Sequence, residues 1–244
     1  MIAHENRNWI KEAENFLYER YIHLRHLDPP EVMPLIINPP LDESEARYFI
    51  RGLEEKLFYV YDGEYVQSTL LPLPSGKNTT QKMLQLFWAR KGRWGLFREG
   101  VCQLATASSL ILKYGWPSAD VVMEPCKGEF RDFAYGVDLL IRDEARGITI
   151  CGEVKRNRSE FRRLIEGFRY CCQRGPHTRD QCSFAKNHRK YQFCAEVKPE
   201  PVYFFATAPG EEICFKLVGL EIREEHRGLV YNQTGNRNVP TVES

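Results

Sequence analysis

Hydrophobic positions near the start of the chain follow the helical period twice and then alternate as they do in strands. Apolar side chains three and four residues apart predict an amphipathic helix over about residues 5–26. A second helix is expected to begin after Asp42, with Glu45 three residues on as the partner of a capping box. Alternating aromatic and aliphatic residues then predict a hairpin with strands over 57–61 and 65–70.

A segment rich in Pro, Ser, Gly, Asn and Thr at residues 72–80 predicts a linker. We therefore divide the chain into an N-terminal helical and hairpin accessory block over 1–80 and a main domain over 81–244. The block contains no catalytic grouping, so we expect an accessory or dimerisation element. After the linker, apolar spacing predicts a short helix over about 83–88. A longer helix is predicted over 97–112, because a glycine and a proline follow it.

The next elements are predicted to be mostly strands. A strand is predicted at about residues 120–124, followed by two strands over 136–142 and 148–155 that a short polar turn joins. A basic and aromatic helix over about 159–173 comes next, and residues 202–207 form a further buried strand. The order is helix, three strands, helix, strand. This order predicts an α/β domain with a mixed central sheet.

The two central strands carry the polar residues of most interest. If Asp143 pairs with Ile148 across the turn, an antiparallel register places Asp138 opposite Glu153. Lys155 lies two residues beyond Glu153 and shares its face, because side chains alternate along a strand. Two carboxylates and a lysine therefore meet at one end of the hairpin. A surface ion pair at the end of an ordinary hairpin is the structural alternative.

This grouping suits the hydrolysis of phosphodiesters. Mg²⁺ prefers carboxylate and water oxygens, and a neighbouring ammonium can orient an attacking water or offset charge that grows on a phosphate. The arrangement of Asp138, fourteen intervening residues and then Glu153-Val154-Lys155 resembles the signature of PD-(D/E)xK nucleases. Val137 stands where that signature usually has proline.

The surrounding segments extend the resemblance. Leu96-Phe97-Arg98-Glu99, the apolar helix and Lys113-Tyr114-Gly115-Trp116 are similar in layout to Mrr-type restriction enzymes and archaeal Holliday-junction resolvases, over about residues 92–208. The resemblance implies a restriction-endonuclease-like αβββαβ core. It also implies a set of site residues. The implied catalytic residues are Asp138, Glu153, Lys155 and Glu99, and the implied metal ligands are Asp138, Glu153, Glu99 and the carbonyl of Val154.

Two positions depart from the family pattern, and the identity of the third acid is open. Many relatives have Gln where Glu153 stands, and many RecB-like members have Gln-x-x-x-Tyr where this chain has Glu166-Gly167-Phe168-Arg169-Tyr170, which argues against the RecB branch. Glu99 is equally consistent with a helix-start carboxylate that the helix dipole favours. Glu124 competes with it as the third acid.

Composition sets broader bounds. The chain has 244 residues, of which 43% are hydrophobic and 27% charged, enough for one domain or one domain with an appendage. It has no run of eighteen apolar residues and no secretory signal at Met1, so we expect a cytoplasmic protein that makes no contact with a membrane. Its eight cysteines include no Cys-x-x-Cys pair and fit buried free thiols. The alternative is a zinc site of Cys171, Cys172, His177 and Cys182, whose spacing matches no common zinc finger.

Positive charge is concentrated after the second central strand. Residues 155–190 contain eleven basic and three acidic residues, a net charge of +8, whereas the whole chain carries +1. A polyanion is therefore expected to lie there, although a solvated helix flank with internal ion pairs is the alternative. The expected nucleic-acid contacts are Arg156, Arg158, Arg162, Arg163, Arg169, Lys186, Arg189 and Lys190.

Together these features predict an Mg²⁺-dependent DNA endonuclease in which Mn²⁺ can substitute. Cutting both strands with one active site per chain would favour a homodimer. Two other classes stay open: a nucleic-acid-binding module that has lost cleavage, and an interaction subunit of a defence, repair or transposition assembly.

Overall fold

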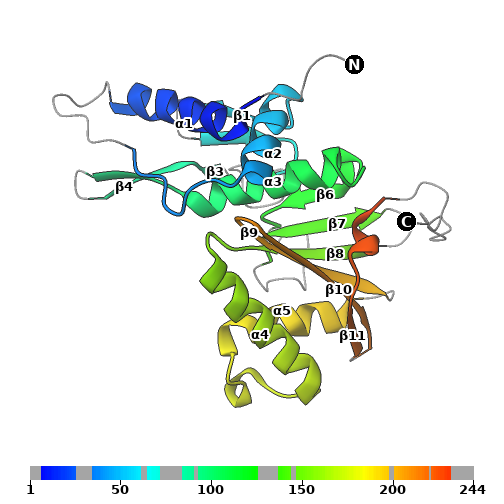
Figure 1. The fold of residues 1–244 in the computed structure, drawn as a ribbon. Helices are drawn as coiled ribbons and strands as arrows, with labels where there is room; N and C mark the ends of the chain where they lie inside the picture. Colours follow the sequence, from blue (N-terminus) through cyan, green and yellow to red (C-terminus); the bar gives the residue numbers. More distant parts are fainter. Residues whose placement is uncertain are drawn as a thin grey trace, which may run out of the picture.

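The computed structural model of the protein is shown in Figure 1. It describes residues 7–25, 35–61, 65–71, 84–90, 93–125, 137–143, 147–197, 201–219 and 221–231.

A six-stranded mixed sheet forms the centre of the molecule, with the strand order β11-β10-β9-β8-β7-β6. Its strands are β6 (Val121–Met123), β7 (Leu139–Asp143), β8 (Gly147–Val154), β9 (Val202–Ala208), β10 (Glu211–Val218) and β11 (Glu221–Glu224). Strands β8 and β9 are parallel, and every other neighbouring pair in this sheet is antiparallel. The expected α/β class with a mixed sheet is therefore confirmed.

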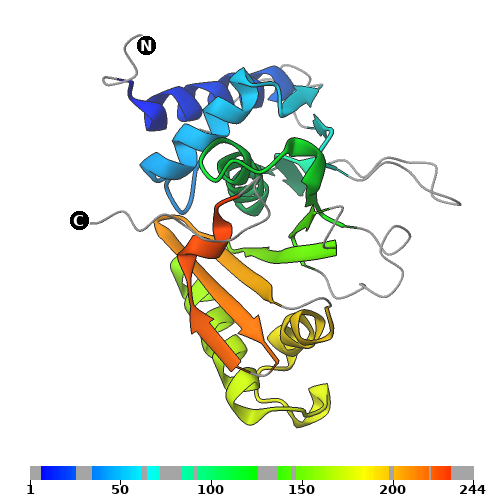
Figure 2. The same cartoon turned by 90° about the vertical axis from the view of Figure 1, so that its right-hand side faces the viewer.

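Helices cover both faces of this sheet, as Figures 1 and 2 show. Helix α3 (Arg98–Leu112) packs on one face, whereas α4 (Arg158–Arg174) and α5 (Ala185–Glu196) pack on the other. All seven residues of β9 are buried. An almost continuous apolar sequence is typical of a strand with both faces covered. The helices expected over 97–112 and 159–173 and the strand expected over 202–207 are present, and α5, β10 and β11 are additions to the predicted elements.

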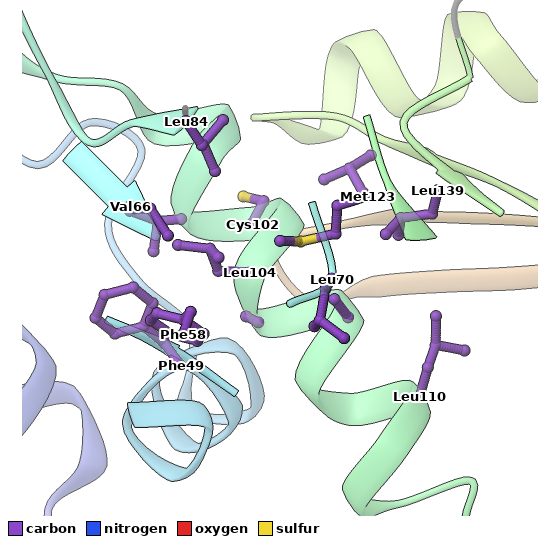
Figure 3. Packing of buried hydrophobic residues seen from close by; sticks show 14 of the residues in the cluster. Phe49, Phe58, Val66, Leu70, Leu84, Cys102, Leu104, Leu110, Met123 and Leu139 are labelled. Carbon is purple, nitrogen blue, oxygen red and sulfur yellow. The ribbon is translucent and has the colours of Figure 1, made fainter. Parts of the chain in front are cut away.

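The N-terminal block packs on α3. Its elements are α1 (Trp9–Arg25), α2 (Glu43–Glu54), β1 (Phe58–Tyr61) and β2 (Tyr65–Ser68). The short strand β3 (Leu84–Gln85), from beyond residue 80, pairs antiparallel with β2. Figure 3 shows Phe49 and Phe58 of this block in the same apolar cluster as Leu104 of α3 and Leu139 of β7. The block therefore shares a hydrophobic core with one face of the sheet. The expected linker at 72–80, and with it the boundary at residue 80, lies outside the described residues.

Helix α2 begins as expected, but its cap is only half of the predicted one. Asp42 Oδ1 accepts hydrogen bonds from the amides of Ser44 at 2.9 Å and Glu45 at 3.1 Å. The expected capping box is wrong, because the carboxylate of Glu45 points into the protein and pairs with Arg98 instead. A buried guanidinium needs an opposite charge more than a helix terminus needs a second cap.

The short helix expected over 83–88 is a strand pair instead. Strand β4 (Phe87–Arg90) pairs antiparallel with β5 (Arg93–Leu96). A Cβ atom on Gly95 would lie 2.4 Å from the ring of Trp88, so this glycine allows the indole to lie across the facing strand. Apolar pairs four residues apart fit a helix as well as a strand, and the cross-strand partner decided between them.

The central hairpin keeps the predicted register at its acidic end and departs from it near the turn. Leu140 pairs with Cys151 as expected, but a bulge after Ile141 shifts Arg142 to Ile148 and Asp143 to Gly147. Gly147 adopts a positive φ of 76°, a conformation that glycine adopts without strain. The pairing expected for Asp143 with Ile148 is therefore wrong, and so is the pairing of Arg142 with Thr149 that the same register implies.

Three 3₁₀ turns complete the described chain: η1 (Ser118–Asp120), η2 (Arg179–Gln181) and η3 (His226–Leu229). Within the described ranges, none of the helices combines the length and the hydropathy that crossing a bilayer requires.

Candidate active site

Asp138 lies immediately before β7, and its main chain continues the pairing with β8. Its amide donates to the carbonyl of Gly152 at 3.0 Å, while its Oδ2 accepts a hydrogen bond from the amide of Val154 at 2.7 Å. These two bonds hold the carboxylate over the end of β8.

Glu153 lies in β8 with its carboxylate completely buried, at 0% exposure. Lys155 Nζ donates to its Oε2 at 2.6 Å, and Lys190 Nζ, from α5, donates to its Oε1. A buried carboxylate costs several kcal/mol unless it is paired. The two ammonium groups supply that opposite charge from different elements.

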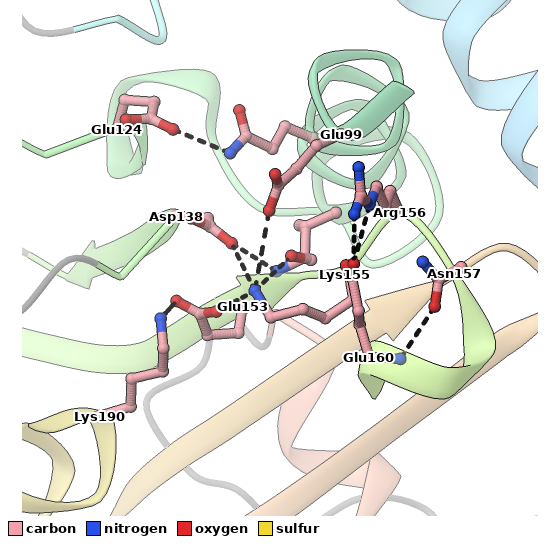
Figure 4. Close-up of polar contacts among 11 residues, drawn as sticks. Glu99, Glu124, Asp138, Glu153, Lys155, Arg156, Asn157, Glu160 and Lys190 are labelled. Atoms are coloured by element: carbon pink, nitrogen blue, oxygen red, sulfur yellow. Dashed lines mark hydrogen bonds and ion pairs between the residues drawn. The ribbon is translucent and has the colours of Figure 1, made fainter. Parts of the chain in front are cut away.

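The ammonium of Lys155 lies among oxygens from three carboxylates and one carbonyl (Figure 4). Its Nζ is 2.6 Å from Glu153 Oε2, 2.8 Å from the carbonyl oxygen of Val154, and 3.8 Å from both Asp138 Oδ2 and Glu99 Oε1. The backbone amide of Lys155 donates to the carbonyl of Thr207 at 2.8 Å, which continues the pairing of β8 with β9. Glu99 and Lys155 are far apart in the sequence, and they meet because α3 packs on the sheet beside the end of β8.

The structure distinguishes the two candidates for the third acid. Glu99, in the first turn of α3, is one of the carboxylates beside Lys155. Glu124 Oε1 instead accepts a hydrogen bond from Gln103 Nε2 at 2.8 Å, to one side of the group in Figure 4. Glu99 therefore joins Asp138 and Glu153, and its place at a helix start is compatible with both readings of its role.

The pKa values of two of the clustered acids, Asp138 and Glu99, are raised, so their ionised forms are disfavoured. Burial, and then the neighbouring charge of Glu153, raise the pKa of Asp138 to about 8, although Lys155 and Lys190 act in the opposite direction. Burial also raises the pKa of Glu99. For Lys155, burial acts to lower the pKa, but Glu153 and Asp138 outweigh it and the pKa lies above its ordinary value.

The donor set fits a hard divalent cation. Carboxylates and a carbonyl oxygen are the ligands that Mg²⁺ prefers, and Glu99, Asp138, Glu153 and Val154 supply them around one point. Burial first, and then the charge of Glu153, raise the pKa of Asp138, so its ionised form is costly without a further cation. A bound divalent cation would favour the ionised form of this carboxyl.

The N-terminal block determines where α3 begins. Arg98, the residue before Glu99, is 4% exposed and donates to the carbonyls of Pro39 at 2.8 Å and Pro40 at 3.2 Å. Both of its terminal nitrogens also donate to the carboxylate of Glu45 in α2. These contacts fix the first turn of α3 and therefore the backbone of Glu99.

The predicted basic contacts fall into three groups. Some are in ion pairs: Arg156 with Glu160 at 2.8 Å, Arg158 with Glu211 at 2.5 Å and Arg169 with Glu224 at 3.4 Å. Arg162, Arg163, Lys186 and Arg189 are exposed, and within the described part of the chain none of the four forms an ion pair. Lys190 lies in the acidic group, against Glu153.

An open depression connects several of these basic residues on the outer surface of α4. Its lining consists of Arg158, Ser159, Arg162, Arg163, Glu166 and Phe184. Helix α4 begins four residues after the last residue of β8. The residues of the depression that lie in α4 therefore come soon after Glu153 and Lys155 in the sequence. We call this feature the basic depression.

The position of Lys190 in the acidic group was not predicted. The basic count included it, but its helix α5 was not among the expected elements. The three-residue spacing of His188, Tyr191 and Cys194, which are all buried, is the sequence signal that could have predicted α5. Its pairing with a residue thirty-seven positions away depends on tertiary structure.

A separate cavity of about 290 Å³ lies between α2, α3 and the turn from β9 to β10. Its lining includes Glu45, Tyr48, Cys102, Thr106 and Glu212, and none of the three clustered acids. The candidate site is therefore defined by converging charges and not by an enclosed cavity.

Comparison of the chain with protein-family models, curated proteins and solved structures gives no significant match. Function must therefore be argued from the geometry and chemistry of the site.

Proposed function

We propose that this protein is a metal-dependent phosphodiesterase that cleaves DNA internally. The observation that carries the proposal is the meeting of Glu99, Asp138 and Glu153 around Lys155 Nζ, at 3.8, 3.8 and 2.6 Å. These acids come from α3, from the residue before β7 and from β8, so that no local ion pair accounts for the grouping. An acid cluster with one lysine is suited to hydrolysis of a phosphodiester.

The arrangement of elements supports a restriction-endonuclease-like catalytic domain. One helix, three antiparallel strands, a further helix and a strand parallel to the third follow in that order from α3 to β9, with α5 inserted before β9. The resemblance of the Asp138 and Glu153-Val154-Lys155 motif to PD-(D/E)xK nucleases points the same way. In layout the motif is most similar to those of Mrr-type restriction enzymes and archaeal Holliday-junction resolvases.

The residues divide into metal ligands and a positioning cation. Glu99, Asp138, Glu153 and the carbonyl of Val154 would hold Mg²⁺, with Mn²⁺ as a substitute. A bound Mg²⁺ would polarise the phosphate and lower the pKa of a coordinated water. Lys155 has its amide held by β9 and its ammonium beside these oxygens, so it is placed to donate to water or to a phosphate oxygen.

Binding of the substrate is assigned to the basic depression. Arg162 and Arg163 extend from α4 into solvent, and within the described part of the chain no acid pairs with them. An arginine without an acidic partner is available for a phosphate, whereas Arg158 and Arg169 must first leave Glu211 and Glu224. We therefore place the DNA backbone across the middle of α4.

Cleavage assays on matched variants test this proposal. Wild type should cut supercoiled plasmid, linear duplex, single strands or a four-way junction in Mg²⁺ or Mn²⁺ and should be inactive in EDTA. Asp138→Asn and Glu153→Gln keep the size of the side chain and one oxygen but lose the charge that holds a hard cation, so both should lose most of the activity. Glu196→Gln, at an exposed acid of α5, is the control. Undiminished cutting in EDTA or in both variants would refute the proposal.

One observation favours a second function, binding without cleavage. Both carboxylate oxygens of Glu153 are already paired, with Lys155 and Lys190, as in a structural ion network. In that case the protein would bind nucleic acid within a larger defence, repair or transposition assembly. Salt-sensitive binding by wild type without turnover in any metal would favour this second function.

A further inference from the structure

Two cysteines and two histidines meet on the far side of the sheet from α3. Cys171 lies in α4, His177 follows that helix, Cys182 comes directly after η2 and His188 lies in α5. One ligand atom from each residue lies within 4.8 Å of the ligand atoms of the other three. We call these four residues the Cys/His cluster.

The distances within this cluster fit a tetrahedral metal. Cys171 Sγ is 3.5 Å from Cys182 Sγ and 3.7 Å from His188 Nδ1. Zinc bonds of about 2.3 Å to sulfur and about 2.0–2.1 Å to nitrogen place tetrahedral ligand atoms roughly 3.4–3.8 Å apart. Both sulfurs belong to free cysteines, so the short approach is not a disulfide.

His177 gives a second, independent indication. Its Nδ1 lies 2.6 Å from the carbonyl oxygen of Gly175 and must donate to it, since a carbonyl oxygen only accepts. The lone pair of the neutral ring is then on Nε2. That atom is buried and has no hydrogen-bond partner among the described residues. A buried nitrogen without a partner is costly, and coordination to a metal would satisfy it.

The surroundings of the ligands are those of a structural site. The amide of Phe184 donates to Cys182 Sγ at 3.3 Å, as backbone amides do for thiolates that bind metals. The sulfurs of Cys171 and Cys182 are buried, together with His188. Soft thiolates with imidazoles select zinc, whereas the carboxylates around Lys155 suit Mg²⁺.

We propose that Cys171, His177, Cys182 and His188 bind one structural Zn²⁺. The proposal keeps three residues of the zinc alternative considered from the sequence, and His188 replaces Cys172 as the fourth. The ion would tie the end of α4, the segment 175–184 and α5 together. Because His188 and Lys190 share α5, the site also supports the lysine that pairs with Glu153. None of this depends on the proposed nuclease activity.

Metal content is the first test. The full-length protein, purified without chelator and without added metal, should contain about one zinc per chain by inductively coupled plasma mass spectrometry. Cys182→Ser and His188→Ala should each lose most of it. Cys172→Ser is the matched control, because it removes a buried thiol next to Cys171 and outside the Cys/His cluster, and it should keep the zinc.

Two measurements on wild type keep the proposal testable if those variants fail to fold. Titration of the thiols with a mercurial should release the zinc in step with modification, and replacement by Co²⁺ should give tetrahedral d–d bands with thiolate charge transfer. Wild type that lacks zinc and does not take up Co²⁺ would overturn the proposal. A Cys171–Cys182 disulfide in the native protein, or folded ligand variants that keep their zinc, would also overturn it. The cleavage assays are independent of all these outcomes.

Discussion

At the scale of single residues, the environment of Lys155 determines what it can contribute. Its side chain is 16% exposed, and its Nζ contacts Glu153 and the carbonyl of Val154. A long side chain held at both its amide and its ammonium keeps little rotamer freedom to lose during a reaction. Under the proposed nuclease function, this charge would act on the transition state and not along the duplex.

Lys155→Met should separate cleavage from binding. The substitution keeps the apolar stem but removes the ammonium, so single-turnover cleavage in saturating Mg²⁺ should fall about 10²-fold, the order seen when one transition-state donor is lost. DNA affinity measured in Ca²⁺ should stay within a few-fold, and metal affinity should hold or rise, because a like charge is removed. Lys113→Met, at an exposed lysine of the same length, is the control. Parallel loss of binding and cleavage would make Lys155 a phosphate contact.

Asp138 should impose a pH dependence on the stability of the metal-free protein. Its pKa is about 8 in the folded protein, against 3.8 as the ordinary value. Between these values the folded state keeps a proton that the unfolded state has lost, so this residue lowers the free energy of unfolding as the pH rises from about 4 to about 8.

Asp138→Asn tests that sign, because the amide carries no charge at any pH. In EDTA the variant should melt a few degrees above wild type at pH 8, and the difference should shrink at pH 5. Mg²⁺ at pH 8 should stabilise wild type more than the variant. Thermal denaturation followed by circular dichroism measures all three. An equal difference at both pH values would mean that Asp138 is ionised throughout.

At the scale of elements, α4 has one apolar face and one basic face. Phe161, Leu164 and Phe168 are buried, and the ring of Phe168 stacks on Phe204 of β9 with a centroid distance of 3.9 Å. Its outer face carries the arginines of the basic depression. The amphipathic pattern therefore places the charges without loss of packing.

The double substitution Arg162→Ala and Arg163→Ala should weaken DNA binding and reduce its salt dependence. Each lost phosphate contact lowers the slope of log K against log salt by about 0.9, so the pair should reduce it by about 2. Fluorescence anisotropy at several salt concentrations measures the slope. Arg169→Ala is the matched control on the same helix, since Arg169 is in an ion pair with Glu224 and should change the slope less. An unchanged slope in the double variant would place the DNA elsewhere.

At the scale of the whole molecule, the N-terminal block and the sheet form one packed unit. Phe49, Phe58 and Leu17 are fully buried in the core that α3 shares with the sheet. The buried pair of Glu45 with Arg98 joins α2 to the residue before Glu99. The block therefore supports the candidate site from a distance, although it holds none of the clustered acids.

Removal of Glu45 should show this support. Glu45→Ala leaves the guanidinium of Arg98 buried without a charge partner, so the free energy of unfolding should fall by roughly 3–5 kcal/mol. Urea denaturation measures the loss. Glu43→Ala breaks an exposed pair with Arg47 on the same helix and should cost under about 1 kcal/mol. Equal costs for the two variants would mean that the buried pair contributes no more than the exposed one.

Local pattern determined most of the elements. The periodicity of α1, α2, α3 and α4, the cap at Asp42 and the facing of Asp138 and Glu153 follow from side-chain spacing, because helices and strands repeat over a few residues. The same reasoning placed Lys155 on the face of Glu153. These features need no knowledge of distant contacts.

Only the tertiary structure decided the features that depend on a distant partner. Residues 83–88 could fit a helix or a strand, and pairing of Trp88 with Gly95 made β4 a strand. Glu45 left its own helix terminus for Arg98, and Glu99 rather than Glu124 reached Lys155. Lys190 and His188 joined their clusters through α5. In each case several local arrangements have similar free energy, and one buried charge or cross-strand contact of a few kcal/mol selects among them.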